Sequence, residues 1–203
     1  MPRHNSGWRV VGETDVVSTR FLRVSDRVVR YGEDPTEHHF TVSHDPDYIQ
    51  VVALTAGDQA VLIKQDHVAE GWSLQLIAGN TRGFETPQAA ARAELGQEGG
   101  WCAKDWHYLG VHVPQTDRII SATPGTDGAK RCHMFLARGL TPTPQRLEPT
   151  EQLQVHLVPW EVVLDCTFSG HPVPGTGLPI LDCGSRLAII LADRYINTVL
   201  QRP

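Results

Sequence analysis

The chain has 203 residues, which is enough for one domain with a full core or for a domain with a small extension. Its hydrophobic content of 40% and charged content of 20% are ordinary for a soluble globular protein. The net charge of −5 gives no basic surface for nucleic acid, and no apolar run is long enough to span a membrane. The first residues lack the apolar core of a signal peptide, so we expect a cytoplasmic protein.

The first fifty residues predict a group of short strands. Alternating and β-branched runs in 9–32 and 37–48 are broken by Gly and Asp, which is typical of strands joined by tight turns. The adjacent histidines His38 and His39 raise the possibility of a metal site. Neighbouring side chains in a strand point to opposite faces, however, and this geometry disfavours shared coordination.

A β-hairpin and a helix follow. Two apolar runs within 48–65 flank "TAGDQ", which indicates a hairpin with a Gly-containing loop, and "SLQLIAG" (73–79) is a further short strand. Residues 86–98 predict a helix, because Thr86 is a good N-cap and Pro87 suits the first helical position. The glycine pair after residue 98 supplies its C-terminal stop.

The second half continues with strands and ends in a helix. We expect strands at 106–113 and 130–140, separated by a long segment, 114–129, whose length suggests a functional loop. Residues 151–163 predict a strand that leads into a helix, and residues 185–200 predict an amphipathic C-terminal helix. This order is typical of an α+β fold, because it lacks a repeating βαβ pattern.

Two acidic residues on the predicted central helix indicate a metal site. Glu94 and Glu98 are four residues apart and share one helix face. Like charges at this spacing disfavour a helix unless a cation lies between them. Mg²⁺ prefers such oxygen ligands and commonly bridges protein carboxylates to substrate phosphates. The alternative is the solvated face of an ordinary surface helix.

The stretch "GNTRGFETPQAAARAELGQEGGW" (79–101) resembles the Nudix box, whose pattern is G-x5-E-x7-R-E-U-x-E-E-x-G-U with U apolar. The box framework falls on Gly79, Glu85 and Gly100, and two of its glutamates fall on Glu94 and Glu98. Two positions depart from the pattern. Ala93 stands in place of the arginine that orients the helix through the first glutamate, and Gln97 replaces one of the acidic residues.

The resemblance covers roughly residues 8 to 195 and is greatest to the ADP-ribose pyrophosphatase-like branch of the Nudix hydrolases. It is carried by "LIKQDH" (62–67), "WSLQLIAG" (72–79), "ATPG" (122–125) and "HMFLA" (133–137), which occur in the order typical of that branch. The resemblance implies a Nudix fold, with a mixed β-sheet sandwiched by helices (α/β/α). It also implies an N-terminal antiparallel β extension at 1–47 that mediates dimerisation, and a Nudix domain at 48–203.

The resemblance also implies which residues form the site. Glu94, Glu98 and the backbone carbonyl of Ala78 would hold Mg²⁺ or Mn²⁺, with Gln97 as an uncharged and weaker ligand. Glu94, Glu98 and a loop acid, Glu151, form the expected catalytic set, with Glu148 as another candidate for the loop acid. The expected substrate-binding residues are Gln65, His67, Gln75 and Asp127.

Two functions remain open from the sequence. The first is a metal-dependent hydrolase that cleaves the diphosphate linkage of a nucleoside diphosphate sugar or a related small molecule, with activity altered by the changes at Ala93 and Gln97. The alternative is a degenerate Nudix protein that binds a nucleotide or metabolite without hydrolysing it, as a regulator or in a repurposed biosynthetic step. In either case the branch implies a homodimer, and no nucleic-acid or membrane partner is expected.

Overall fold

The computed structural model of the protein describes residues 7–19, 22–68, 71–114, 119–122, 129–149 and 151–200. The chain divides into two compact units. Met1–Asp47 and Val113–Arg131 form the extension unit, and Tyr48–His112 and Cys132–Pro203 form the larger unit. The predicted N-terminal extension is therefore joined by a second segment, and this segment comes from the long loop expected at 114–129.

The extension unit is built on a four-stranded sheet with the order β1-β2-β3-β9. The first three strands are antiparallel, as predicted, and the last pairs in parallel with β3. The strand bounds are β1 Trp8–Ser18, β2 Arg23–Tyr31, β3 His38–His44 and β9 Ile119–Ala122.

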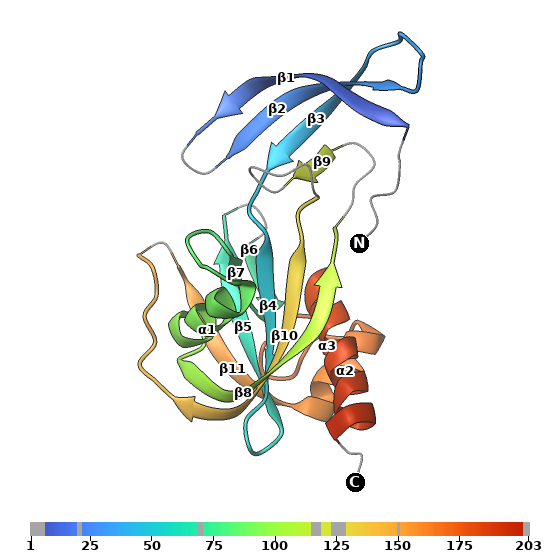
Figure 1. The fold of residues 1–203 in the computed structure, drawn as a ribbon. Coiled ribbons are helices and arrows are strands. Elements are labelled where there is room, and N and C mark those ends of the chain that lie inside the picture. Colours follow the sequence, from blue (N-terminus) through green and yellow to red (C-terminus); the bar gives the residue numbers. More distant parts are fainter. Residues whose placement is uncertain are drawn as a thin grey trace. The chain divides into compact units, whose positions relative to one another are not determined.

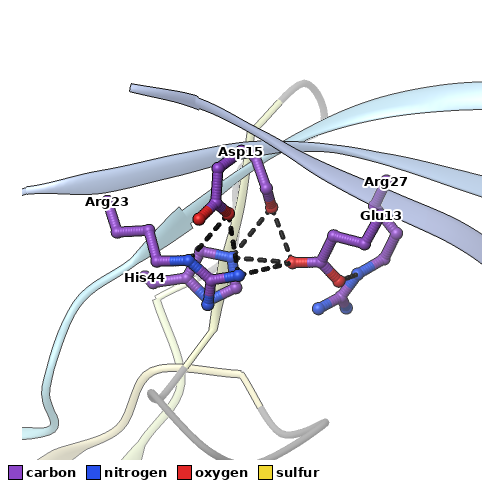
Figure 2. Close-up of polar contacts among 6 residues, drawn as sticks. Glu13, Asp15, Arg23, Arg27 and His44 are labelled. Atoms are coloured by element: carbon purple, nitrogen blue, oxygen red, sulfur yellow. Dashed lines mark hydrogen bonds and ion pairs between the residues drawn. The ribbon is translucent and has the colours of Figure 1, made fainter. Parts of the chain in front are cut away.

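A polar cluster on one face of this sheet is organised around the Glu13 carboxylate (Figure 2). Glu13 accepts hydrogen bonds from Ser25 Oγ at 2.7 Å and from Arg27 Nε at 2.8 Å, and His44 Nε2 lies 2.9 Å away. The hydrogen bond from Ser25 is the main reason that the pKa of Glu13 falls to about 2, with Arg27 adding to it. The cluster thus provides the buried Ser25 and His44 with polar partners.

The two adjacent histidines of the extension have separate partners. His39 Nδ1 lies 2.7 Å from Asp26 Oδ2, whereas the His38 ring packs edge-on against Trp8. The alternation along the strand places their side chains on opposite faces, as the sequence predicts. These contacts do not favour a shared metal site.

The larger unit contains two sheets. The central one has the order β7-β4-β10-β8, with β4 and β10 parallel and the other pairs antiparallel. The second is antiparallel, with the order β11-β5-β6. The strand bounds are β4 Tyr48–Ala53, β5 Gln59–His67, β6 Gly71–Gln75, β7 Ile77–Asn80, β8 Trp101–His112, β10 Cys132–Pro142 and β11 Leu153–Pro159.

Helices cover both faces of the central sheet, as Figure 1 shows within this unit. They are α1 Pro87–Gln97, α2 Trp160–Ser169 and α3 Cys183–Tyr195, the last continuing as a π-helical turn at Ile196–Leu200. Alternate residues of β4 pack against the helices on opposite faces of the sheet. Ile49 and Val51 pack in the cluster that includes α1, and Val52 packs in the cluster that includes α3. The predicted α/β/α layering is confirmed. Among the described residues, no helix is both long and apolar enough to cross a membrane.

Helix α1 begins and ends where the sequence predicts. The Thr86 hydroxyl accepts a hydrogen bond from the backbone N–H of Ala89 at 3.1 Å, and Pro87 occupies the first turn. The chain leaves the helix through Gly100, whose φ of +71° favours glycine. The close agreement arises because capping signals are local and do not depend on tertiary contacts.

A buried polar network fixes α3 to the central sheet. Asp182 caps the helix by accepting the Ser185 N–H at 2.7 Å, and it also accepts a hydrogen bond from the Gln50 side chain at 2.5 Å. Ser185 Oγ in turn accepts the backbone N–H of Leu76 at 3.1 Å, in the break between β6 and β7. The network satisfies buried polar groups and fixes the strand that leads into the box.

The packing of α1 generates a stability prediction. Leu95 is fully buried between α1 and the central sheet, so Leu95→Ala should lower the free energy of unfolding by about 2–5 kcal/mol, as measured by urea denaturation. Ile190→Ala, on an α3 position with 39% exposure, is the matched control and should cost less than about 1 kcal/mol. Equal losses in the two variants would contradict the packing described here.

Candidate active site

The two box glutamates lie on the buried face of α1. Ala91 and Leu95 pack into the core beneath this helix, and Glu94 and Glu98 follow them at helical spacing along the same face. Glu98 is only 4% exposed and Glu94 is half-buried. The alternative of a solvated surface face is therefore wrong, because these carboxylates face the sheet.

Glu98 lies against the backbone of β7. Its Oε2 accepts a hydrogen bond from the Ala78 N–H at 3.2 Å. Burial, and after it the nearby Glu94 charge, raises the pKa of Glu98 to about 8, while the hydrogen bond from Ala78 acts in the opposite direction. Without a cation, this carboxyl group therefore holds a proton at neutral pH.

Glu94 contacts the same strand one residue further along. A Cβ added at Gly79 would overlap the Glu94 carboxylate, so the first glycine of the box provides the space for this side chain. Burial, together with the smaller effects of the Glu151 and Glu148 charges, raises the pKa of Glu94 to about 7. The site thus contains two adjacent acids whose ionised forms are disfavoured by burial and by neighbouring negative charge.

The loop between β10 and β11 brings two more acids toward this site. Glu148 and Glu151 are joined by two hydrogen bonds. The Glu148 N–H donates to Glu151 Oε2 at 2.8 Å, and the Glu151 N–H donates to the Glu148 carbonyl at 3.0 Å. Both charges act on Glu94, and that of Glu151 also acts on Glu98. The structure therefore places the predicted loop acid beside the box.

The same loop is tied to the end of α1. The Gln145 side-chain amide donates to the Glu98 carbonyl at 2.5 Å, and the Arg146 N–H donates to the Gln97 carbonyl at 3.1 Å. A third bond runs from the Thr143 N–H to the Gly100 carbonyl at 2.8 Å. Loop and helix are thereby held together, and Gln145 is a contact that the sequence pattern did not indicate.

The structure clarifies the two departures from the box pattern. Arg92, next to Ala93, lies over the Trp106 ring at 5.0 Å from its centroid and does not replace the missing arginine. Glu85 is exposed, and no ion pair joins it to any residue that the structure describes. The Gln97 side chain is also exposed, so it lies on a more solvated side of the helix than Glu98.

Three of the four predicted substrate residues lie together on the second sheet. Gln75 Nε2 on β6 donates to Gln65 Oε1 on β5 at 3.0 Å, and Gln75 and His67 line one cleft of about 800 Å³. Asp127 lies outside the described residues. Trp72 also lines this cleft, and its sequence context alone does not place it inside or outside a binding site.

The residues present suit a hard divalent cation. The two buried carboxylates lie against β7, and the first box glycine leaves room for one of them, which is the oxygen-rich arrangement that Mg²⁺ and Mn²⁺ favour. Within the described residues, no three Asp, Glu, His or Cys side chains converge to form a complete cage. A bound cation would thus have two carboxylates and the backbone of β7 as protein donors, and further ligands would come from water and substrate.

Comparisons with known proteins agree with this geometry. Residues 45–173 match the family model described as the NUDIX domain. A protein from Streptomyces rubellomurinus, named CMP-5'-(N-acetyl-N-hydroxy-3-aminopropyl)phosphonate hydrolase, is 25% identical over 178 residues, which cover 86% of this chain and 81% of that protein. A solved structure described as an ADP compounds hydrolase superposes with a TM-score of 0.72 over 94% of both chains at 16% identity, which shows a shared fold.

The raised pKa values predict a pH-dependent stability in metal-free protein. A carboxyl group with a folded pKa near 8 and an ordinary pKa of 4.5 keeps its proton in the folded state after the unfolded chain has lost it. The group has no effect on stability below pH 4.5 and destabilises the fold progressively as the pH rises toward 8. In EDTA, wild type should therefore lose up to about 4 kcal/mol relative to Glu98→Gln between pH 5 and pH 8 in urea denaturation. A constant difference across that range would contradict the burial of this charge.

Proposed function

Because this chain belongs to the Nudix family of hydrolases, we propose that it is a metal-dependent enzyme that hydrolyses the diphosphate linkage of a nucleoside diphosphate conjugate. The observation that carries the proposal is the pair of buried carboxylates, Glu94 and Glu98, on the core-facing side of α1. Two such charges are costly to bury unless a cation lies between them. A site that served only stability would place apolar residues here.

The acids of the site have two proposed roles, which are metal binding and proton transfer. Glu94 and Glu98 would act as metal ligands, with the Ala78 carbonyl as the third protein group and Gln97 as an optional neutral ligand. A bound Mg²⁺ or Mn²⁺ supplies charge stabilisation at the phosphoryl oxygens and lowers the pKa of a bound water. Glu151 is the loop residue that would accept a proton from the attacking water, because its charge already acts on both box glutamates.

The substrate class follows from the family and from the relatives. One relative is named as a hydrolase of a CMP-linked phosphonate and a structural neighbour as a hydrolase of ADP compounds. Both names describe a nucleotide joined to a second group. We therefore propose a nucleoside diphosphate sugar or a related conjugate, such as ADP-ribose or a CMP conjugate, as the substrate.

One observation favours a second function. Glu85 has lost its arginine, and no ion pair replaces it among the described residues. An incompletely anchored box would bind a nucleotide while turning it over slowly or not at all. This is the alternative of a degenerate Nudix protein that acts as a regulator or in a biosynthetic step.

A substrate panel separates the two functions. ADP-ribose, nucleoside diphosphate sugars and CMP conjugates are incubated with Mg²⁺ or Mn²⁺, and phosphatase-releasable phosphate is measured. We expect turnover of at least one compound, with a loss of at least about a hundredfold in Glu98→Gln, because the variant removes a charged ligand. Binding of a nucleotide without turnover of any compound would instead support the degenerate binder.

We further propose that residues 1–47 mediate a homodimer. Strand β1 is the outer strand of its sheet and is exposed along nearly its whole length, including the apolar Val10, Val16 and Val17. Exposed apolar edge strands are usually covered in stable proteins, because they otherwise pair with other chains. A second copy of the extension would cover this strand.

Mass measurement in solution tests the dimer. Wild type should have a mass of about 45 kDa, which is twice the chain mass of 22.5 kDa. Val16→Lys should shift the protein toward the monomer, because it places a charge on a residue with 65% exposure in the proposed interface. A monomeric wild type at micromolar concentration would overturn the proposal.

A further inference from the structure

The last carbonyl groups of α1 find their hydrogen-bond partners in the acid loop, which we define as residues 143–149 and 151. An α-helix leaves its final carbonyls without partners inside the helix. Here the Gln97 carbonyl accepts the Arg146 N–H at 3.1 Å, and the Glu98 carbonyl accepts the Gln145 side-chain amide at 2.5 Å. The last turn contains no basic residue that could supply such donors itself. The acid loop therefore acts as the C-terminal cap of α1.

The Gln145 contact falls on the residue that carries the more buried carboxylate. The Glu98 N–H donates to the Glu94 carbonyl at 2.9 Å, and its Oε2 accepts the Ala78 N–H at 3.2 Å. Gln145 holds the one remaining polar group of the residue, its backbone carbonyl. Helix ends fray when they are not held. Without the Gln145 amide, the turn that carries the Glu98 carboxylate would lose its cap.

The last glycine of the box allows the loop to come this close. Gly100 has a φ of +71°, and a Cβ added there would lie 3.2 Å from the Thr143 carbonyl oxygen and 3.6 Å from Gln145 Cβ. The Thr143 N–H also donates to the Gly100 carbonyl at 2.8 Å. Gly100 thus serves both the turn out of the helix and the approach of Gln145.

The acid loop also orients Glu151 from within. Glu151 Oε2 accepts the Glu148 N–H at 2.8 Å, so the direction of this carboxylate depends on where residue 148 lies. Glu148 follows Gln145 by only three residues, which span at most about 10 Å of chain. A displacement of the chain at Gln145 would therefore also displace the Glu151 carboxylate.

We propose that Gln145 is a positioning residue, which sets the Glu98 carboxylate through the end of α1 and the Glu151 carboxylate through the acid loop. The assignment rests on the proposed function, in which Glu98 binds the metal and Glu151 accepts a proton. A glutamine suits this role because its amide donates a hydrogen bond without adding a charge beside the acids. A lysine or arginine at this position would compete with the cation for the same carboxylates.

Amide exchange in EDTA tests the contact without metal or substrate. Gln145→Met keeps an unbranched side chain at an exposed position but removes the donor. Exchange at the Arg146 and Glu98 amides should become about two- to tenfold faster, because one hydrogen bond is lost. Rates are measured by NMR relative to the amides of the central strand β10. Gln152→Met is the matched control, since Gln152 is an exposed glutamine in the same connection between β10 and β11.

Metal binding and turnover test the positioning role. Titration with Mn²⁺, followed by electron paramagnetic resonance, should show about two- to tenfold weaker binding in Gln145→Met and no change in Gln152→Met. At saturating Mn²⁺, kcat for a conjugate that wild type hydrolyses should fall by about ten- to a hundredfold, with KM changed less than about twofold, because Glu151 is misplaced. A residue that only stabilised the fold would change neither the Mn²⁺ affinity nor kcat of the folded enzyme.

The outcomes distinguish this proposal from the proposed function. Faster exchange together with weaker Mn²⁺ binding in Gln145→Met supports the positioning role, even if no conjugate in the panel is hydrolysed. Exchange equal to that of wild type at both amides overturns it, and so does Mn²⁺ affinity equal to that of wild type. If wild type itself binds no Mn²⁺, the proposed function is wrong at the metal and the positioning role falls with it, whereas the exchange rates still decide whether Gln145 caps α1.

Discussion

The organisation of the site depends on the burial of two carboxylates between α1 and β7. Glu98 accepts a hydrogen bond from the Ala78 N–H, and Glu94 occupies the space that the absence of a side chain at Gly79 leaves free. Each group is held where its ionised form is unfavourable, so the folded protein has a strong tendency to gain a proton or a cation there. The helix that carries these groups is in turn fixed by the apolar contacts of Leu95 and by its N-cap at Thr86.

Helix α1 lacks the arginine of the box pattern at Ala93, and other contacts hold it against its neighbours. Arg92 packs on Trp106 of β8, and Gln145 binds the carbonyl at the end of α1. Both contacts hold the helix, but neither adds charge next to Glu85. The framework of the box is therefore retained by packing and hydrogen bonds, whereas its original electrostatic pairing is absent in the described residues.

The sequence predicted the features that local chemistry determines. The bounds of α1, the shared face of Glu94 and Glu98, and the order of strands around the box all follow from capping and periodicity. Three features depended on tertiary contacts and could not be predicted. They are the β9 strand inside the expected loop, the Gln145 contact with α1, and the position of Trp72 beside Lys64. The periodicity of α1 also could not show whether its acidic face met water or the sheet.

The central claim is that Glu94 and Glu98 still hold a divalent cation although Gln97 has replaced a carboxylate. Titration with Mn²⁺ at pH 8, followed by electron paramagnetic resonance, counts bound metal without requiring a substrate. Wild type should bind Mn²⁺ at least about tenfold more tightly than Glu98→Gln, and Gln97→Glu should bind it more tightly still, because each carboxylate adds a charged ligand. Equal and weak Mn²⁺ binding by wild type and Glu98→Gln would contradict the claim.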